Sequence, residues 1–389
     1  MGITKLNQHV YINSYNVVSS LGSDARKSFR ALLDGKSNPL KIGQNIGFKV
    51  HEKVEELLNS TIDPKLHYAD RSLQLLEVCL GGLSFSGMSM DPTRAGVIVA
   101  SSRGASELLE KSYRKFFAGE KLMAKTSPYT TSGVFSSYLA QKLGFTGGGF
   151  SLSSACTSSL NAIGTAYHLI KSGLFDSCLV GGTEAPLTPF TMEILNRTGV
   201  TNKVESPFPL RSLGESEGIK KGMVLGEGSG LVFLSTKPNK FTFARIKAFQ
   251  MSGESSGLTG LSADGRALSR AIIKIIEDVG VEASQIDIIC AHGSGTEKGD
   301  SAEINAYKSV FKEKMPPILL SKWATGHTLG AAGVMSLCFA IETLRAGILP
   351  NVPYNFFQKN ILPSKEPRTA LITGLGFGGG ASALLIEKV

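Results

Sequence analysis

The sequence predicts a layered α/β fold, because short apolar runs ending in small residues alternate along it with segments of helical spacing. The composition agrees with this prediction: 42% of the 389 residues are hydrophobic, 19% are charged, and 44 glycines outnumber 15 prolines. These values are typical of a folded enzyme and exclude a mainly disordered or collagen-like chain. At roughly 150 residues per domain, the chain has room for two or three domain-sized units.

Four apolar runs are expected to be buried strands whose carboxyl ends open into glycine-rich loops. They are Ala95–Ala100 before SSRG, Ser177–Val180 before GGTE, Ile286–Ala291 before HGSGTE, and Ala370–Thr373 before GLGFGGG. Two helices are expected where apolar residues recur at Leu160, Ile163, Tyr167 and Ile170, and at Leu268, Ile272, Ile275, Ile276 and Val279. Gly173 and Gly280 follow these segments and suit helix ends, because glycine adopts a left-handed backbone at little cost.

The chain is expected to consist of two halves, residues 1–236 and 237–389. Two stretches, CLVGGTE at Cys178–Glu184 and CAHGSGTE at Cys290–Glu297, resemble one another and give a weak sign of internal duplication. The segment Thr236–Gln250 begins with a Pro-Asn turn and restarts an alternating strand, which places the boundary there. No low-complexity linker interrupts the chain, so the halves are expected to pack together.

Charge and targeting signals narrow the classes of partner. The 41 Lys and Arg against 32 Asp and Glu give a net charge of +9, which favours an acidic partner. The basic residues are scattered and lack interleaved aromatic residues, so nucleic acid is not the expected partner. The N-terminal sequence MGITKLNQHVYINSYNVVSS lacks the apolar stretch of a secretory signal, and we find no run of about 18 apolar residues. We therefore expect a cytoplasmic protein without a membrane span.

Cys156 is the first candidate for chemistry. It lies in SLSSACTSS, directly before a predicted helix, where the helix dipole and nearby amide N–H groups favour a thiolate. Small flanking residues leave room for a substrate carbonyl to approach the Cys156 N–H, which would form half of an oxyanion hole. The alternative is a small buried core cysteine. That role is expected for the other four cysteines, which lie in apolar surroundings: Cys79, Cys178, Cys290 and Cys338. The odd number of cysteines and the absence of C-x-x-C spacing predict neither disulfides nor a metal site.

His292 is the second candidate, at the end of a predicted strand in AHGSGTEKGDSAE. An imidazole there can bond a carbonyl oxygen or transfer a proton, and the Ser294 and Thr296 hydroxyls can hold an amide-bearing substrate. A structural histidine is the alternative.

Lys322 and His327 lie in SKWATGHTLGAAG, between an apolar strand and a long apolar helix. A connecting loop that carries a cation and an imidazole favours a functional site, although Lys322 alone is also consistent with a solvated loop charge. The small residues of Gly330–Gly333 would let the helix pack closely against another backbone.

The last candidate is the glycine-rich segment Gly374–Ser382 around Phe377. Such a loop can supply backbone N–H groups and move a bulky ring. A dinucleotide site is not expected, because the helix, second strand and acidic residue of that motif do not follow before Val389. A cysteine at a helix N-terminus, two loop histidines and amide donors together indicate acyl transfer.

In their chain order these motifs resemble those of the elongating β-ketoacyl-acyl carrier protein synthases, in the thiolase superfamily. The matching motifs are SSACTSS, GEGSG at Gly226–Gly230, HGSGT followed by Asp300 and Glu303, SKWATGHTLGAAG, and GFGG. The resemblance implies a thiolase-like, duplicated five-layer αβαβα fold. It also implies an acyl carrier protein as partner, and a dimer formed with a second copy or with a chain-length-factor-like homologue.

The same resemblance implies the reaction. Cys156 would take an acyl chain from the carrier protein, and malonyl-carrier protein would then lose carbon dioxide and attack the Cys156 thioester. His292 and His327 would contact the malonyl thioester and stabilise the enolate oxygen. Phe377 would be the gate and, through its N–H, the second oxyanion donor. No metal or organic cofactor is implied, because the substrates are carried on phosphopantetheine.

Supporting roles follow from the resemblance as well. Lys322 would orient the histidines and pair with Glu303. The remaining assignments are substrate binding by Ser294, Thr296, Gly378 and Gly379, and structural support by Asp300 and Glu303.

Two residues distinguish related classes. Initiating synthases have Asn where this chain has His327, and thiolases have a second catalytic cysteine where it has Phe377 and glycines.

The chain departs from the family pattern at Ser294, where Thr is usual, at Ala381, where Asn is usual, and in Ser206–Gly222, which lacks the Pro-Phe-Asp form. These departures make a specialised polyketide or aryl-polyene pathway an alternative to fatty acid synthesis. Two further alternatives are a non-elongating partner subunit and a coenzyme A-dependent thiolase-like enzyme.

Overall fold

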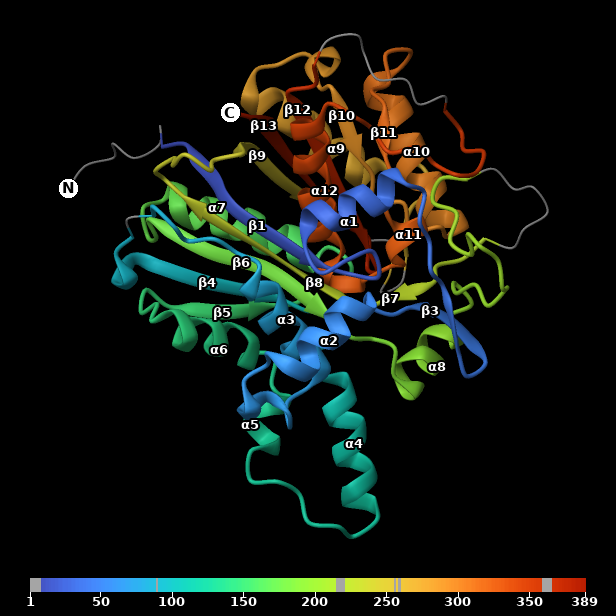
Figure 1. Ribbon diagram of the computed structural model, residues 1–389. Coiled ribbons are helices and arrows are strands. Elements are labelled where there is room, and N and C mark those ends of the chain that lie inside the picture. The colour runs from blue at the N-terminus through green and yellow to red at the C-terminus, as the bar shows by residue number, and fades with distance from the viewer. Residues whose placement is uncertain (1–7, 89, 215–220, 255–256, 258–259, 359–365) are drawn as a thin grey trace.

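The computed structural model describes residues 8–88, 90–214, 221–254, 257, 260–358 and 366–389. Its main feature is a sheet of ten strands in the order β11-β10-β12-β13-β9-β1-β8-β6-β4-β5 (Figure 1). Five strands precede residue 236: β1 (Val10–Val18), β4 (Ala95–Ala100), β5 (Gly149–Leu152), β6 (Ser177–Glu184) and β8 (Gly228–Ser235). Five follow it: β9 (Ala244–Ser252), β10 (Ile288–Cys290), β11 (Ile318–Leu319), β12 (Thr369–Gly376) and β13 (Gly380–Lys388). A separate small sheet contains β2 (Leu40–Ile42), β3 (Asn45–Phe48) and β7 (Leu225–Gly226).

The two sets of five strands have the same topology. From the centre of the sheet outward, the first set runs β1, β8, β6, β4, β5 and the second runs β9, β13, β12, β10, β11. In both sets the two central pairs are antiparallel and the two outer pairs are parallel. The sets join where Val10–Ile12 of β1 pairs with Ala244–Ile246 of β9. The fold is therefore duplicated, as the sequence predicts.

The likeness of CLVGGTE and CAHGSGTE, however, does not come from this duplication. CLVGGTE lies on β6, the fourth strand of its set in chain order, whereas CAHGSGTE begins on β10, the second strand of the other set. The structural counterpart of β6 is β12. The two stretches are alike because both are buried strand ends that open into a loop, and they do not occupy equivalent positions.

Helices complete the five layers. The middle layer contains α7 (Ser158–Lys171) and α12 (Ala332–Ala346), which pack on each other and on strands of both sets (Figure 1). One outer layer contains α3 (Arg71–Gly81) and α6 (Val134–Leu143), and the other contains α9 (Arg266–Val279) and α10 (Glu297–Phe311). The remaining helices are α1 (Ala25–Leu33), α2 (Glu52–Ser60), α4 (Ser106–Phe117), α5 (Thr126–Thr130), α8 (Pro189–Arg197) and α11 (Lys322–Thr325).

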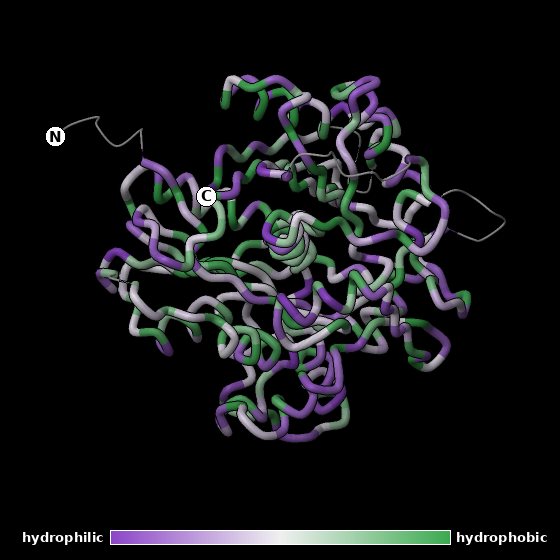
Figure 2. The backbone as a smooth tube through the Cα atoms, turned by 45° about the horizontal axis from the view of Figure 1, so that its top comes forward, coloured by the Kyte–Doolittle hydropathy of each residue, from purple (hydrophilic) through white to green (hydrophobic). Residues whose placement is uncertain are grey.

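The expected local elements are present. The four predicted strands correspond to β4, β6, β10 and β12, and the two predicted helices to α7 and α9. Two of the expected loops were placed too early, because β6 continues through GGTE to Glu184 and β12 continues to Gly376. Gly173 and Gly280 have positive φ angles of 77° and 67°, as expected for residues at helix ends. Hydrophobic segments concentrate in the interior and hydrophilic ones at the periphery (Figure 2). The four cysteines expected in the core are fully buried.

The stretch Leu329–Ala346 is long and apolar enough to cross a membrane by length and composition, although Glu342 and Arg345 interrupt its apolar residues. Nine-tenths of it (89%) is buried inside the protein, where it forms the centre of the middle layer. This placement accounts for its apolar composition, because α12 packs against strands and helices on all sides.

The middle layer depends on small residues. A Cβ atom at Gly333 would lie 2.8 Å from the backbone nitrogen of Leu160 on α7, and one at Gly330 would lie 2.5 Å from the nitrogen of Ser102. Real Cβ atoms do not approach so closely, so α12 reaches its position only with glycine at these places. The expected close packing of Gly330–Gly333 is confirmed.

Replacing Gly333 with Ala should therefore destabilise the protein by about 1–3 kcal/mol, the usual cost of overpacking. Gly81, at the end of α3, provides a matched control because a Cβ there meets nothing within 4 Å. Gly81→Ala should raise stability by about 0.5–1 kcal/mol. Urea denaturation of both variants measures the difference, and equal stability of the two would contradict the packing argument.

Candidate active site

Cys156 lies on a sharp turn between β5 and α7. Ala155, directly before it, has a positive φ of 51°, which is strained for a residue with a side chain. The turn is held by Ser158, whose hydroxyl accepts from the Ser154 N–H at 2.8 Å and donates to the Ala155 carbonyl at 2.5 Å. Such a turn presents the cysteine at the N-terminus of the helix, as the sequence predicts.

The thiol is nevertheless protonated at neutral pH. Burial raises the pKa of Cys156 to about 12, although the positive charge of Lys322 acts to lower it. The negative charge of Glu184 also raises it. The expectation that the helix end would favour a thiolate is therefore outweighed by desolvation.

His292 and His327 lie against each other, with ring centroids 5.1 Å apart and an interplanar angle of 76°. Both are buried. Burial and the charge of Lys322 hold the pKa of each imidazole well below its usual range, and the His327 ring acts on His292 in the same direction. Both rings are therefore neutral near pH 7, which leaves each with one N–H donor and one acceptor.

The orientation of His327 is fixed by its neighbours. The backbone N–H of His327 donates to the Val224 carbonyl at 2.7 Å, and the backbone carbonyl of His327 accepts from the Gly226 N–H at 3.1 Å. These two bonds tie the histidine to β7. The Nδ1 atom accepts from the Leu329 N–H at 3.2 Å. Since Nδ1 is an acceptor, the ring proton lies on Nε2, which is free to donate to a ligand.

Lys322 begins the short helix α11 and is buried, so it is not a solvated loop charge. Its Nζ donates to the carbonyl of His292. Glu303 on α10 accepts from the N–H groups of His292 at 2.6 Å and Gly293 at 2.7 Å. Glu303 acts to raise the pKa of Lys322, so the two charges attract each other as expected. The two opposite charges hold the His292 backbone from either side.

The hydroxyls expected to bind substrate lie at the start of α10. Ser294 and Thr296 are hydrogen-bonded to each other at 2.8 Å, and Thr296 caps the helix by accepting from the Gly299 N–H at 3.2 Å. Asp300 accepts from the N–H groups of Leu213 at 2.8 Å and Gly295 at 3.0 Å. Burial and the neighbouring Glu303 raise the pKa of Asp300 to about 7. Asp300 thus holds this loop against the segment that follows Ser206, of which residues 215–220 lie outside the described part.

The glycine-rich segment forms a hairpin between β12 and β13, with Phe377, Gly378 and Gly379 as its turn. Gly376 lies against the Cys156 turn, since a Cβ there would be 3.5 Å from both the Cys156 nitrogen and the Ser154 oxygen. Phe377 is 43% exposed. The hairpin therefore brings backbone groups to Cys156 while Phe377 is partly in solvent.

Sequence reasoning missed Glu184, the last residue of β6. Its buried carboxylate accepts from the N–H groups of Ser102 at 2.9 Å, Arg103 at 3.0 Å and Gly330 at 2.8 Å, and from the hydroxyls of Ser101 and Ser102. It thus connects the loop after β4 to the turn after His327. The signal was present, because a glutamate closes the apolar run in GGTE and a charge at a buried strand end needs partners.

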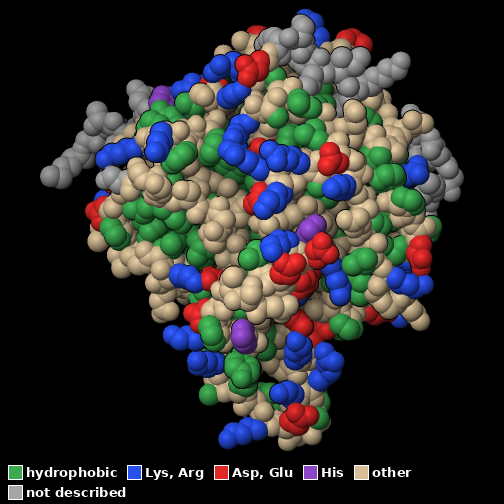
Figure 3. Space-filling view, in the orientation of Figure 1, with side chains coloured by type: hydrophobic (Ala, Val, Ile, Leu, Met, Phe, Trp, Pro, Cys, Tyr) green, Lys and Arg blue, Asp and Glu red, His purple; other side chains and the backbone are tan. Residues whose placement is uncertain are grey.

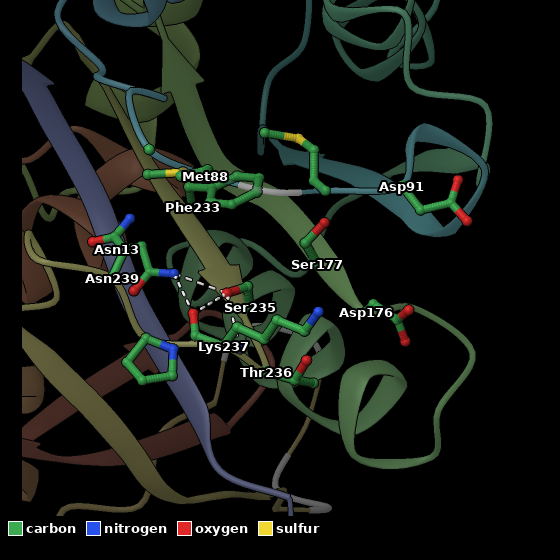
Figure 4. Close-up of a pocket in the computed structure, with 13 residues that line it drawn as sticks. Asn13, Met88, Asp91, Asp176, Ser177, Phe233, Ser235, Thr236, Lys237 and Asn239 are labelled. Atoms are coloured by element: carbon green, nitrogen blue, oxygen red, sulfur yellow. Dashed lines mark hydrogen bonds between the residues drawn. The ribbon is translucent and has the colours of Figure 1, made fainter.

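A cavity of about 380 Å³ lies elsewhere, lined by residues that include Asn13, Met88, Ser177, Phe233 and Lys237 (Figure 4). Ser177 begins β6, whereas Glu184 ends it at the active site. At about 3.3 Å per residue the two ends of β6 are roughly 23 Å apart. The cavity therefore does not belong to the site.

The duplicated five-layer fold, with Cys156 and His327 in the loops that lead into the two central helices, is that of the thiolase-like proteins. Within this class the chain belongs to the β-ketoacyl synthase family. Residues 9–239 match the N-terminal domain of β-ketoacyl synthases and residues 243–354 match the C-terminal domain.

Two relatives illustrate the similarity. The mitochondrial 3-oxoacyl-[acyl-carrier-protein] synthase of Arabidopsis thaliana is 29% identical over 293 residues, which make up 69% of this chain and 64% of that protein. The 3-oxoacyl-[acyl-carrier-protein] synthase 2 of Vibrio cholerae is 25% identical over 98% of this chain and 99% of its own length.

Two solved structures share the fold. One is a complex of a type II polyketide synthase acyl-carrier protein with its ketosynthase, at a TM-score of 0.83 and 22% identity, covering 98% of this chain and 99% of that chain. The other is a ketosynthase in complex with its chain length factor from Xenorhabdus doucetiae, at a TM-score of 0.82 and 21% identity, covering 100% of both chains.

The raised pKa of Cys156 predicts how it reacts. Because only the thiolate is alkylated, the rate of Cys156 modification by iodoacetamide should rise about tenfold per pH unit from neutrality, without a plateau below pH 9. Peptide mass spectrometry, with Cys156→Ala as the control, measures this rate. A plateau near pH 7 would show that the thiolate is stable and that burial does not dominate.

Proposed function

We propose that the protein is a β-ketoacyl-acyl carrier protein synthase, which condenses malonyl-carrier protein with an acyl chain held on Cys156. The observation that carries the proposal is the buried pair of neutral imidazoles beside a cysteine at a helix N-terminus. Cys156 shares an apolar cluster with Leu329, two residues after His327, so the two motifs meet.

In the first half-reaction Cys156 attacks the acyl thioester. A bond forms between its sulfur and the acyl carbon, the bond to the pantetheine sulfur breaks, and the thiol proton goes to the departing pantetheine. Transfer of this proton removes the need for a free thiolate, in agreement with the raised pKa of Cys156. The N–H groups of Cys156 and Phe377 stabilise the oxyanion.

In the second half-reaction malonyl-carrier protein binds and loses carbon dioxide. The electron pair of the broken bond forms a thioester enolate, and its oxygen accepts from the Nε2–H of His327 and from His292. A neutral imidazole suits this task, because a cationic one would pair with the malonyl carboxylate and retain it. The enolate carbon then attacks the Cys156 thioester and the bond to the Cys156 sulfur breaks, which lengthens the chain by two carbons. The sulfur takes up a proton from solvent and returns to the thiol.

The apolar residues around Cys156 are suited to an alkyl or polyene chain. They are Met192, Leu195, Met223, Leu225 and Leu329.

The chemistry needs no metal or organic cofactor, because the thioester activates the carbonyl and release of carbon dioxide drives bond formation. Ser294, Thr296, Gly378 and Gly379 would contact the pantetheine arm at the mouth of the site.

The charge of the surface supports an acidic carrier protein as partner. The chain has a net charge of +9, and Lys and Arg spread over the face shown in Figure 3 with fewer Asp and Glu among them. Attraction between unlike charges speeds the encounter of two proteins.

The free edge of the sheet supports a dimer. β5 is the last strand on its side, and Phe150 on it is 41% exposed. The neighbouring arm of α4 and α5, at the bottom of Figure 1, adds exposed Tyr113, Phe116 and Phe117. An open edge with apolar residues is a template for pairing. We infer that a second copy, or a chain-length-factor-like homologue, covers this edge.

The primary test is acyl loading. Incubation with acyl-carrier proteins of graded length should give an acyl adduct on the intact protein, and Cys156→Ala should abolish it. The acyl group that loads fastest distinguishes fatty acid elongation from a polyene or aryl-primed pathway. An adduct that survives in Cys156→Ala would refute the assignment of the nucleophile, and no adduct with any chain would favour a non-elongating partner subunit.

His327→Ala separates the half-reactions. Because His327 acts only on the malonyl group, the variant should still load acyl chains on Cys156, while its condensation rate falls about 100-fold or more. Product formation from malonyl-carrier protein measures this loss. Condensation at the wild-type rate would exclude His327 from the enolate site.

A further inference from the structure

A buried hydrogen-bond network lies beneath His292 and includes two residues outside the motifs. The Tyr307 hydroxyl donates to Glu303 Oε1 at 2.6 Å and lies 2.7 Å from Thr373 Oγ1. Thr373 Oγ1 in turn donates to the same Glu303 oxygen at 2.8 Å. Tyr307 and Glu303 are completely buried, and Thr373 is 1% exposed. The three side chains therefore form a closed group without contact to solvent.

This network acts on a carboxylate that holds His292. Oε1 of Glu303 accepts from the His292 N–H at 2.6 Å, and Oε2 accepts from the Gly293 N–H at 2.7 Å. The carboxylate thus spans two successive peptide groups, while Lys322 holds the His292 carbonyl on the other side. A rotation of Glu303 would therefore move the His292 backbone.

The sequence position of Tyr307 explains its effect on that rotation. It follows Glu303 by four residues on α10, so it lies one helical turn away on the same face. Burial holds the pKa of the phenol well above its usual range, and Glu303 acts in the same direction. The hydroxyl is therefore always a donor to the carboxylate. If the Tyr307 hydroxyl is removed, Glu303 Oε1 has only two donors left, the His292 N–H and the Thr373 hydroxyl.

We propose that Tyr307 is a positioning residue: it fixes Glu303 and thereby the placement of His292 for the malonyl half-reaction. The proposal rests on the function proposed above. Among the described residues the Tyr307 hydroxyl bonds Glu303 and Thr373 and not Cys156 or its turn, so it has no part in acyl loading.

Tyr307→Phe removes only the hydroxyl. A matched control is Tyr15→Phe, because the Tyr15 hydroxyl also donates to a buried carboxylate, that of Glu342, at 2.6 Å. Glu342 lies near the C-terminal end of α12, whereas the active site is at its N-terminal end. The two variants should lose comparable thermal stability. Any difference in activity between them therefore arises from where each hydroxyl lies relative to the active site.

The expected result is a split between half-reactions. Malonyl decarboxylation by acyl-loaded Tyr307→Phe should fall about fivefold or more in kcat, while acyl loading stays within about twofold of wild type. Tyr15→Phe should keep both rates within about twofold of wild type. Equal losses in the two half-reactions, an equal loss in Tyr15→Phe, or no loss would each overturn the proposal.

A second measurement does not depend on activity. Selective 15N labelling of the six histidines, with assignment by substitution, reports the His292 amide signal. This signal should move in Tyr307→Phe and stay in place in Tyr15→Phe, and an unmoved signal would overturn the positioning role. If wild type neither loads acyl chains nor decarboxylates malonyl groups while the signal moves, the proposed function fails and the coupling of Tyr307 to His292 stands.

Discussion

The active site depends on one buried cation. Lys322 is 4% exposed, and its charge acts on Cys156, His292 and His327 together. A positive charge lowers the pKa of any neighbouring group, which helps the thiol lose its proton and keeps both imidazoles neutral. Acyl loading needs a thiol that can give up its proton to the leaving group, and decarboxylation needs neutral imidazoles. Burial lowers the pKa of Lys322 itself, and Glu303 acts against that decrease across the His292 peptide.

The duplicated topology explains how residues far apart in sequence reach that cation. In each set of strands the third strand leads into a central helix, β5 into α7 and β11 into α12. Cys156 precedes the first of these helices and His327 precedes the second. Because α7 and α12 pack against each other through Gly333 and Leu160, the two loops are brought together. Cys156 and His327 thus occupy equivalent places in the two halves.

Much of this arrangement could be predicted from the sequence, because each motif carries its own local signal. Apolar runs marked the strands, and the cysteine, the two histidines and the glycine-rich hairpin were recognised by residue type and position. The protonation of Cys156 could not be predicted, since it depends on how completely the surrounding layers exclude water. The helix dipole is visible in a sequence, whereas the desolvation that outweighs it is a property of the packed fold.

The groups that sequence reasoning missed or misassigned share a physical cause. Glu184 and Tyr307 act through buried carboxylates whose donors come from distant segments, such as Gly330 for Glu184 and Thr373 for Glu303. A single sequence shows such a residue only as a charge or a phenol in an apolar run. The same limit applies to Lys322 and Glu303, which were expected to pair and which attract each other across one peptide: Lys322 holds its His292 carbonyl and Glu303 holds its Gly293 N–H. An ion pair and a pair of charges that share a backbone group satisfy the same electrostatic requirement, and only the path of the chain decides between them. Here the second arrangement has a consequence that direct pairing would lack, because it holds the His292 backbone in place along with the charges.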